Sequence, residues 1–145
     1  MALGEVFALS FLLIFAGWFN INTGLSNDYS TREQAVNNIC YRYTQTASDL
    51  GVLTQPMFDE FSSKISLYGE FDIKIVAERF ENDGSKTQLE GSSVIGLDLR
   101  ENNYQIVSIY AEAKKRHPLS AVYKMFPFNY DVEYRLIGYS SAYVQ

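Results

Sequence analysis

Residues 1–19 read MALGEVFALSFLLIFAGWF, and this stretch decides how the rest of the chain can fold. It contains one charged side chain, Glu5, and one hydroxyl, Ser10, and the first basic residue in the sequence is Arg32. As an α-helix it would be about 28 Å long, close to the hydrocarbon thickness of about 30 Å in a bilayer. Because a small soluble domain does not leave such a segment in water, we expect it to lie in lipid or among other copies of the chain.

Three interpretations of residues 1–19 compete. A secretory signal peptide is disfavoured, because it normally has a cationic region before a shorter apolar run, and no basic residue precedes this run. A simple membrane anchor explains the apolar length but not Glu5, since an acid within a spanning segment is costly and usually has a partner. The nearest cation is the α-amino group of Met1, on the same chain or on a neighbouring copy, and this pairing requires Met1 to be a free terminus.

The third interpretation rests on the position of the acid. An apolar N-terminal helix without basic residues and with glutamate as its fifth residue resembles a mature type IV pilin. The start Met1-Ala-Leu-Gly-Glu5 departs from the commonest pilin start, which is Phe followed by Thr-Leu-Ile-Glu. It is more similar to the tight-adherence branch of the family, including the TadE-like pseudopilins. The closing residues 139–145, YSSAYVQ, also resemble the last strand of TadE-like proteins from Gram-positive bacteria.

The resemblance implies a structural subunit of an extracellular filament. A prepilin peptidase would remove a leader ending in glycine ahead of Met1, the new terminus would be methylated, and the helix would pass from the inner membrane into the filament core. The implied partners are other copies of the chain, in a helical homopolymer at the cell surface, and the pilus assembly machinery. The implied assembly residues are Met1, through its amine, and Glu5. The residues expected to pack between helices in the filament core are Phe7, Phe11, Leu12, Phe15 and Trp18.

The physical chemistry of Glu5 favours a role in setting the register between copies. An ionised carboxylate in an apolar medium loses several kcal/mol of hydration, and an ammonium about 4 Å away returns about 4 kcal/mol at an effective dielectric of about 20. Burying the complete ion pair therefore changes the free energy little, whereas burying either charge without its partner is strongly unfavourable. We therefore expect a subunit whose amine meets Glu5 to be preferred over one shifted by a turn. In an isolated anchor, by contrast, Glu5 would lie near the lipid headgroups and stay hydrated.

Composition narrows the remaining classes of function. The net charge of −5 argues against a nucleic-acid partner, which needs a basic patch. Cys40 is the only cysteine and His117 the only histidine, so neither a thiolate metal site nor a histidine cluster can form within one chain. We expect Cys40 to be a small core residue and His117 to be solvated in a loop. The sequence contains no recognisable catalytic or cofactor-binding motif, so we predict no catalytic residues, no metal site and no cofactor.

The N-terminal helix is expected to continue well beyond residue 19. Asn20, Asn22 and Gly24 are poor helix formers, and the segment 20–24 is interpreted either as a loop or, as the resemblance suggests, as a helix that melts locally. Apolar residues then recur at spacings of three and four up to Leu50, and Gly51 is suited to end the helix. This pattern divides the chain into residues 1–51, the N-terminal helix, and residues 52–145, a β-rich globular head.

The head is predicted to be of the α+β class, with a short helix and an antiparallel sheet. Thr54 or Gln55 is suited to cap the helix, Pro56 fits its first turn and Gly69 closes it. Alternation of apolar and polar residues and the turn signal at residues 82–84 indicate the strands. Three strands are expected at residues 71–78, 93–100 and 104–114. Residues 118–128 are interpreted as irregular or as a short helix. A last strand is expected from the alternation at Tyr130, Val132, Tyr134 and Leu136.

Two alternatives to a filament subunit follow from the same features. One is a single-pass pseudopilin or accessory protein that stays in the membrane and primes pilus assembly. The other is a binding or sensing domain that the apolar segment tethers to a membrane. Recovery of the chain in sheared surface filaments would favour the filament subunit, whereas recovery only from detergent-solubilised membranes would favour an alternative.

Overall fold

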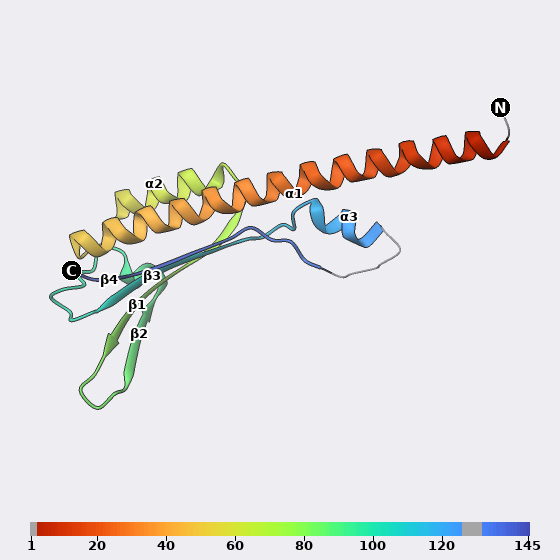
Figure 1. The fold of residues 1–145 in the computed structure, drawn as a ribbon. Coiled ribbons are helices and arrows are strands. Elements are labelled where there is room, and N and C mark those ends of the chain that lie inside the picture. Colours follow the sequence, from red (N-terminus) through yellow and green to blue (C-terminus); the bar gives the residue numbers. More distant parts are fainter. Residues whose placement is uncertain (1–2, 126–131) are drawn as a thin grey trace. The chain divides into compact units, whose positions relative to one another are not determined.

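The computed structural model describes residues 3–125 and 132–145 of the chain. The fold is α+β, as the sequence predicts, with a long N-terminal helix, a short helix and a four-stranded antiparallel sheet (Figure 1). In chain order the elements are α1 (Leu3–Leu50), α2 (Gln55–Ser66), β1 (Phe71–Phe80), β2 (Lys86–Glu90), the 3-10 helix η1 (Gly91–Val94), β3 (Ile106–Ala113), α3 (Leu119–Met125) and β4 (Ile137–Tyr143).

The chain divides into two compact units, and α1 contributes to both. The helix unit comprises residues 1–31 and 117–134, and the head unit comprises residues 32–116 and 135–145. The first part of α1 therefore belongs to the helix unit together with α3. Its second part belongs to the head unit together with α2 and the sheet.

Helix α1 is unbroken from Leu3 to Leu50, so the loop proposed for residues 20–24 is not present. The Asn20 side-chain amide donates a hydrogen bond to the Ala16 carbonyl one turn earlier, at 2.8 Å, which satisfies this polar side chain on the helix surface. Gly24 costs about 1 kcal/mol relative to alanine, which a long helix can absorb. The helix ends as predicted, because Gly51 adopts a φ of 73°, a left-handed conformation that favours glycine.

Helix α2 confirms the predicted short helix and its N-terminal cap. The Thr54 hydroxyl accepts a hydrogen bond from the Met57 N–H, and proline occupies the first turn, where a missing N–H is not needed. Phe61 and Ile65 are the buried residues of the helix.

The strand order of the sheet is β2-β1-β3-β4, with all neighbours antiparallel. β1 and β2 form a hairpin across the predicted turn, where Gly84 has a φ of 82° and the Ser85 N–H donates to the Asp83 carboxylate at 2.8 Å. β3 lies between β1 and β4, with Ile75 opposite Ile109 and Tyr110 opposite Tyr139. Residues in direct register share a face of the sheet, so this pairing fixes which side chains face the core.

The core of the head unit lies between one face of the sheet and two helices. α2 runs alongside the second part of α1 (Figure 1). One buried cluster joins residues of α1, α2 and β3: Val36, Cys40, Tyr43, Phe61, Ile65, Ile109 and Ala111. β4 approaches α1 so closely that a Cβ at Gly138 would lie 2.7 Å from Cys40 Sγ and 2.7 Å from a Val36 methyl carbon. Glycine at position 138 is therefore needed for this packing.

One predicted strand is not present and one strand was not predicted, and the structure gives the reason for each. Residues 93–100 are not a strand, because η1 occupies Gly91–Val94 and glycine φ angles of 70° at Gly91 and 79° at Gly96 turn the chain out of an extended path. The second strand of the sheet is instead β2, which the sequence analysis missed. Its residues are mostly exposed, and a strand without a buried face gives only a weak alternating pattern.

The predicted strands at 71–78 and 104–114 are confirmed as β1 and β3, with slightly different ends. The last strand begins later than the alternation predicted, at Ile137. Val132, Tyr134 and Leu136 precede it, and the Tyr134 N–H is bonded to the Ser120 hydroxyl instead of to a neighbouring strand. Tyr130 lies outside the described residues. Of the two interpretations of residues 118–128, the short helix holds for Leu119–Met125.

Candidate functional site

The apolar segment, residues 3–19 of α1, is exposed on all sides of the helix. Apart from Trp18, which is half-buried, its large apolar side chains have exposed fractions from 48% for Val6 to 77% for Leu3. Leu12, Leu13 and Ile14 follow one another and point in different directions around the helix, yet all are exposed by 60% or more. α1 is long and apolar enough to cross a membrane, and no residue in its most apolar window is buried. A helix that is apolar all round requires an apolar surrounding.

The five residues predicted to pack between helices lie within this segment. Phe7, Phe11, Phe15 and Trp18 follow at spacings of four, four and three residues, so they form one stripe along the helix, with Leu12 next to it. The rings of Phe15 and Trp18 are in contact, with centroids 6.1 Å apart. Because the structure contains one chain, packing of this stripe against other copies stays a prediction.

Glu5 lies on the exposed surface of the first turn of α1. The partial positive charge at a helix N-terminus stabilises an acid in this position. Met1, the predicted partner of Glu5, lies outside the described residues, so the pair itself stays a prediction. The Ser10 hydroxyl donates to the Val6 carbonyl at 2.8 Å, which satisfies the one hydroxyl of the apolar run. Glu5 is the one charged side chain of this run.

The residues of the proposed melted segment are all helical. Asn20 and Gly24 are exposed and Asn22 is half-buried, and a Cβ added at Gly24 would meet no atom within 4 Å. No side chain of the described residues therefore packs closely over Gly24. Local unwinding of this stretch upon assembly stays part of the resemblance and is not a feature of the single chain.

His117 is buried, which corrects the expectation of a solvated loop histidine. Its Nε2 lies 3.0 Å from a carboxylate oxygen of Asp28, and its Nδ1 accepts a hydrogen bond from the Leu119 N–H at 3.2 Å. Since Nδ1 is an acceptor, the neutral imidazole carries its proton on Nε2 and donates it to Asp28. Only 8% of His117 is exposed, because the aromatic ring of Tyr29 packs edge-on against it with centroids 5.4 Å apart.

Further contacts within the helix unit involve Tyr29 of α1, Tyr123 of α3 and Tyr134. Tyr134 packs edge-on against Tyr29 at 5.3 Å between centroids, and Tyr123 lies 5.4 Å from Tyr134. Burial, together with the adjacent Tyr123, raises the pKa of the Tyr134 hydroxyl. The Ser120 hydroxyl accepts from the Tyr134 N–H at 2.8 Å and lies 3.3 Å from the Tyr134 carbonyl, so it is engaged by the backbone. The arrangement fits a structural anchor better than a nucleophile with its base.

Cys40 is a fully buried core residue, as predicted. Burial raises the pKa of its thiol to about 11, because the surrounding side chains cannot solvate a thiolate. Among the described residues, no three side chains of His, Cys, Asp or Glu gather where a metal ion could bind.

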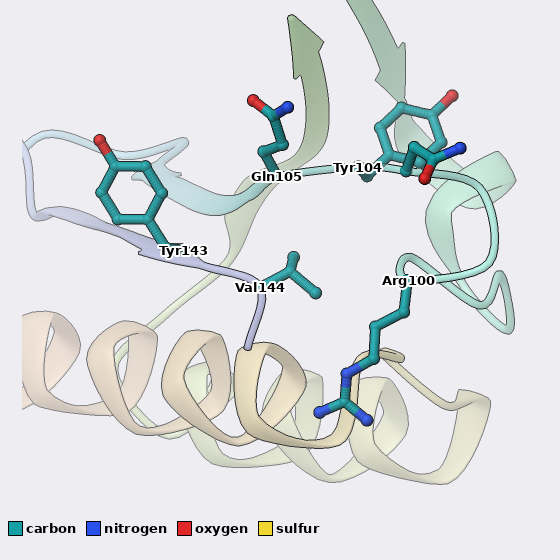
Figure 2. Close-up of a pocket in the computed structure, with 6 residues that line it drawn as sticks. Arg100, Tyr104, Gln105, Tyr143 and Val144 are labelled. Atoms are coloured by element: carbon teal, nitrogen blue, oxygen red, sulfur yellow. The ribbon is translucent and has the colours of Figure 1, made fainter.

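Two hollows border exposed tyrosines of β4, the first on the outer face of the sheet and the second between the end of β4 and the loop that precedes β3. A hollow of about 250 Å³ is lined by Lys74, Val76, Glu78, Gln88, Glu90, Ser108, Tyr110 and Tyr139. The second hollow, of about 420 Å³, is lined by Arg100, Asn103, Tyr104, Gln105, Tyr143 and Val144. Figure 2 shows Tyr104 and Tyr143 on opposite sides of the second hollow, with Gln105 between them. The Arg100 guanidinium donates to the backbone carbonyls of Asp49 and Gln145, so it links two parts of the chain.

Comparisons with protein-family models, curated proteins and solved structures give no match. The long apolar N-terminal helix and the small antiparallel sheet are compatible with a pilin-like fold and with a single-pass membrane anchor. A signal sequence near the N-terminus can also be long and apolar enough to meet this description. Sequence reasoning missed the buried His117 and the hollows beside β4, since both depend on residues far apart in the chain.

Proposed function

We propose that the chain is a pilin-like structural subunit that polymerises through residues 1–50 into an extracellular filament and displays the head on its surface. The observation that carries the proposal is the apolar segment, whose large side chains other than Trp18 are all exposed on a helix that continues into a folded core. Transfer of each such side chain out of water is worth about 1.5–3 kcal/mol, so many copies can bury a large apolar surface together.

Glu5 supports a polymer over a simple anchor. A membrane anchor gains nothing from an acid in its first turns, and a buried charge is costly unless it is paired. In a polymer, the terminal amine of each entering subunit needs a nearby anion, and Glu5 supplies one. The pair then selects one register between neighbouring helices.

The alternative is a single-pass pseudopilin or accessory protein that remains in the membrane and primes pilus assembly. The observation that favours it is that α1 alone is long and apolar enough to cross a bilayer, without other copies. In this alternative the chain is inserted by the same segment but does not leave the membrane.

The test is to shear the surface of cells that make the chain and to compare the sheared fraction with detergent-solubilised membranes. A polymer predicts filaments in which this chain is the main component. Phe11→Lys should abolish both membrane insertion and filaments, whereas Tyr41→Lys, at an aromatic residue of α1 that is 59% exposed, should change neither. Recovery of the unaltered chain exclusively from membranes would refute the filament proposal and support the alternative.

A further inference from the structure

The two faces of the sheet differ in what covers them. One face packs against α1 and α2, whereas the opposite face carries Tyr139 and Tyr143 of β4, which are 59% and 75% exposed. The strand register places Tyr110 opposite Tyr139, and the hydroxyls of Ser108 and Ser141 are 3.0 Å apart on this same face. The outer face of the sheet along β4 therefore carries tyrosine rings and hydroxyl groups, with Ile137 at the start of the strand.

The two exposed tyrosines form a line that connects the two hollows. Tyr139 lines the hollow of about 250 Å³, and Tyr143 lines the hollow of about 420 Å³ (Figure 2). They are four residues apart on one strand, so their Cα atoms are about 14 Å apart at about 3.4 Å per residue. A ligand that touches both rings must be extended along β4 instead of compact.

The charges on this face are balanced. Lys74 pairs with Glu90 at 2.9 Å, and Lys86 pairs with Glu78 at 2.7 Å. The guanidinium of Arg100 is engaged by two backbone carbonyls. Such a face attracts neither a polyanion nor a polycation, so a nucleic acid and an acidic peptide fit it poorly.

Several groups beside these rings have unused hydrogen-bonding capacity. The side chains of Asn103, Gln105, Tyr139 and Tyr143 make no hydrogen bond within residues 3–125 and 132–145. An amide offers two donors and one acceptor oxygen, and a phenol offers one of each. Tyrosine also provides a rigid, amphipathic contact surface at a small cost in conformational entropy.

These features match the chemistry of a neutral sugar chain. A pyranose ring has an apolar face of C–H groups, which packs on an aromatic ring, and a rim of hydroxyls, which bond to amides and phenols. We propose that the outer face of the sheet binds an extended, neutral oligosaccharide along β4, with Tyr139 and Tyr143 as stacking rings and with Asn103 and Gln105 as hydrogen-bonding groups. This binding is independent of polymerisation, so it is tested on the unassembled chain.

The experiment uses the full chain in lipid nanodiscs and measures binding by titration calorimetry. The probes are the neutral hexasaccharides of β-1,4-linked glucose, β-1,4-linked N-acetylglucosamine and α-1,4-linked glucose, with the hexasaccharide of galacturonic acid as the charged comparison. We expect saturable binding of at least one neutral sugar and weaker binding of the acidic one. Absence of binding by all three neutral sugars, or tighter binding of the acidic sugar, would overturn the proposal.

Variants locate the binding on β4. Tyr139→Ser and Tyr143→Ser should each weaken the affinity about tenfold, whereas Tyr139→Phe should retain most of it, because the ring stays in place. Tyr41→Ser, which removes a tyrosine of the same 59% exposure from α1, is the matched control and should bind as the unaltered chain does. Circular dichroism verifies that each variant is folded. Equal affinity in the Tyr139→Ser, Tyr143→Ser and Tyr41→Ser variants would show that β4 does not bind the sugar.

Discussion

The two ends of α1 are parts of one helix, yet they are stabilised by different surroundings. Residues 3–19 contain no buried side chain, whereas the part of the helix in the head unit buries Val36, Cys40, Tyr43, Thr44, Ala47 and Ser48. The second part packs against α2 and the sheet of its own chain. The apolar segment has no such core among the described residues, and we propose that it finds its apolar surrounding in other copies of the chain or in lipid. One continuous helix can therefore serve an intramolecular and an intermolecular purpose.

The largest effect should come from deleting a core ring. Phe61→Ala should lower the free energy of unfolding of the head by about 3–5 kcal/mol, because Phe61 is fully buried between α1 and the sheet. Phe11→Ala, at a ring that is 69% exposed, should leave the same free energy unchanged. Urea titration in detergent micelles measures both variants. Similar losses in the two variants would mean that the two parts of α1 are not stabilised differently.

A second effect follows from Cys40 and depends on pH. Burial raises the pKa of this thiol from 9.0 to about 11 in the folded chain, so folding favours the protonated form. The resulting stability is fully present below pH 9 and is lost as the pH rises towards 11, by on the order of 2–3 kcal/mol. The measurement is the free energy of unfolding across this range, with Cys40→Ala as the control for other titrating groups. An equal pH dependence in the control would remove Cys40 as the cause.

The smallest effects concern two glycines, Gly138, which is tightly packed, and Gly24, which has open space beside it. Gly138→Ala should destabilise the head by about 1–3 kcal/mol, because the added methyl group would meet Cys40 and Val36 at 2.7 Å. Gly24→Ala should instead stabilise α1 by up to about 1 kcal/mol, since its Cβ would meet no atom within 4 Å. Thermal unfolding monitored by circular dichroism compares the two. Destabilisation by Gly24→Ala would indicate that this stretch needs to unwind even in the single chain.

Local patterns predicted those elements whose cause is local. Gly51 ends α1, Thr54 caps α2, and the alternation from Phe71 predicts β1, because each signal lies within a few residues of the structure it causes. Cys40 was also placed correctly, since it lies on the apolar face of a strongly periodic helix.

Features that depend on distant residues could not be predicted in this way. His117 and Asp28 are separated by 89 positions, and nothing near His117 indicates that an aspartate will cover it. β2 was not predicted because its exposed residues show little alternation of apolar and polar side chains. The alternation at residues 132–136 predicted a strand that begins too early, because Tyr134 bonds to His117 and Ser120 instead of to a neighbouring strand. The tyrosine line on the sheet appears only once the register of β3 and β4 is known.

The most direct test of a polymer held in register by Glu5 is to replace that residue by its neutral isostere. Cells whose only copy carries Glu5→Gln are compared with cells carrying Glu101→Gln, an exposed acid of the head, and both membrane-held subunit and sheared filament are measured. We predict that Glu5→Gln leaves the head folded and inserted but strongly reduces filament yield, since an unpaired buried amine costs about 3–5 kcal/mol per subunit. Glu101→Gln should yield normal filaments. Normal filament yield from the Glu5→Gln cells would contradict the role of Glu5 in assembly.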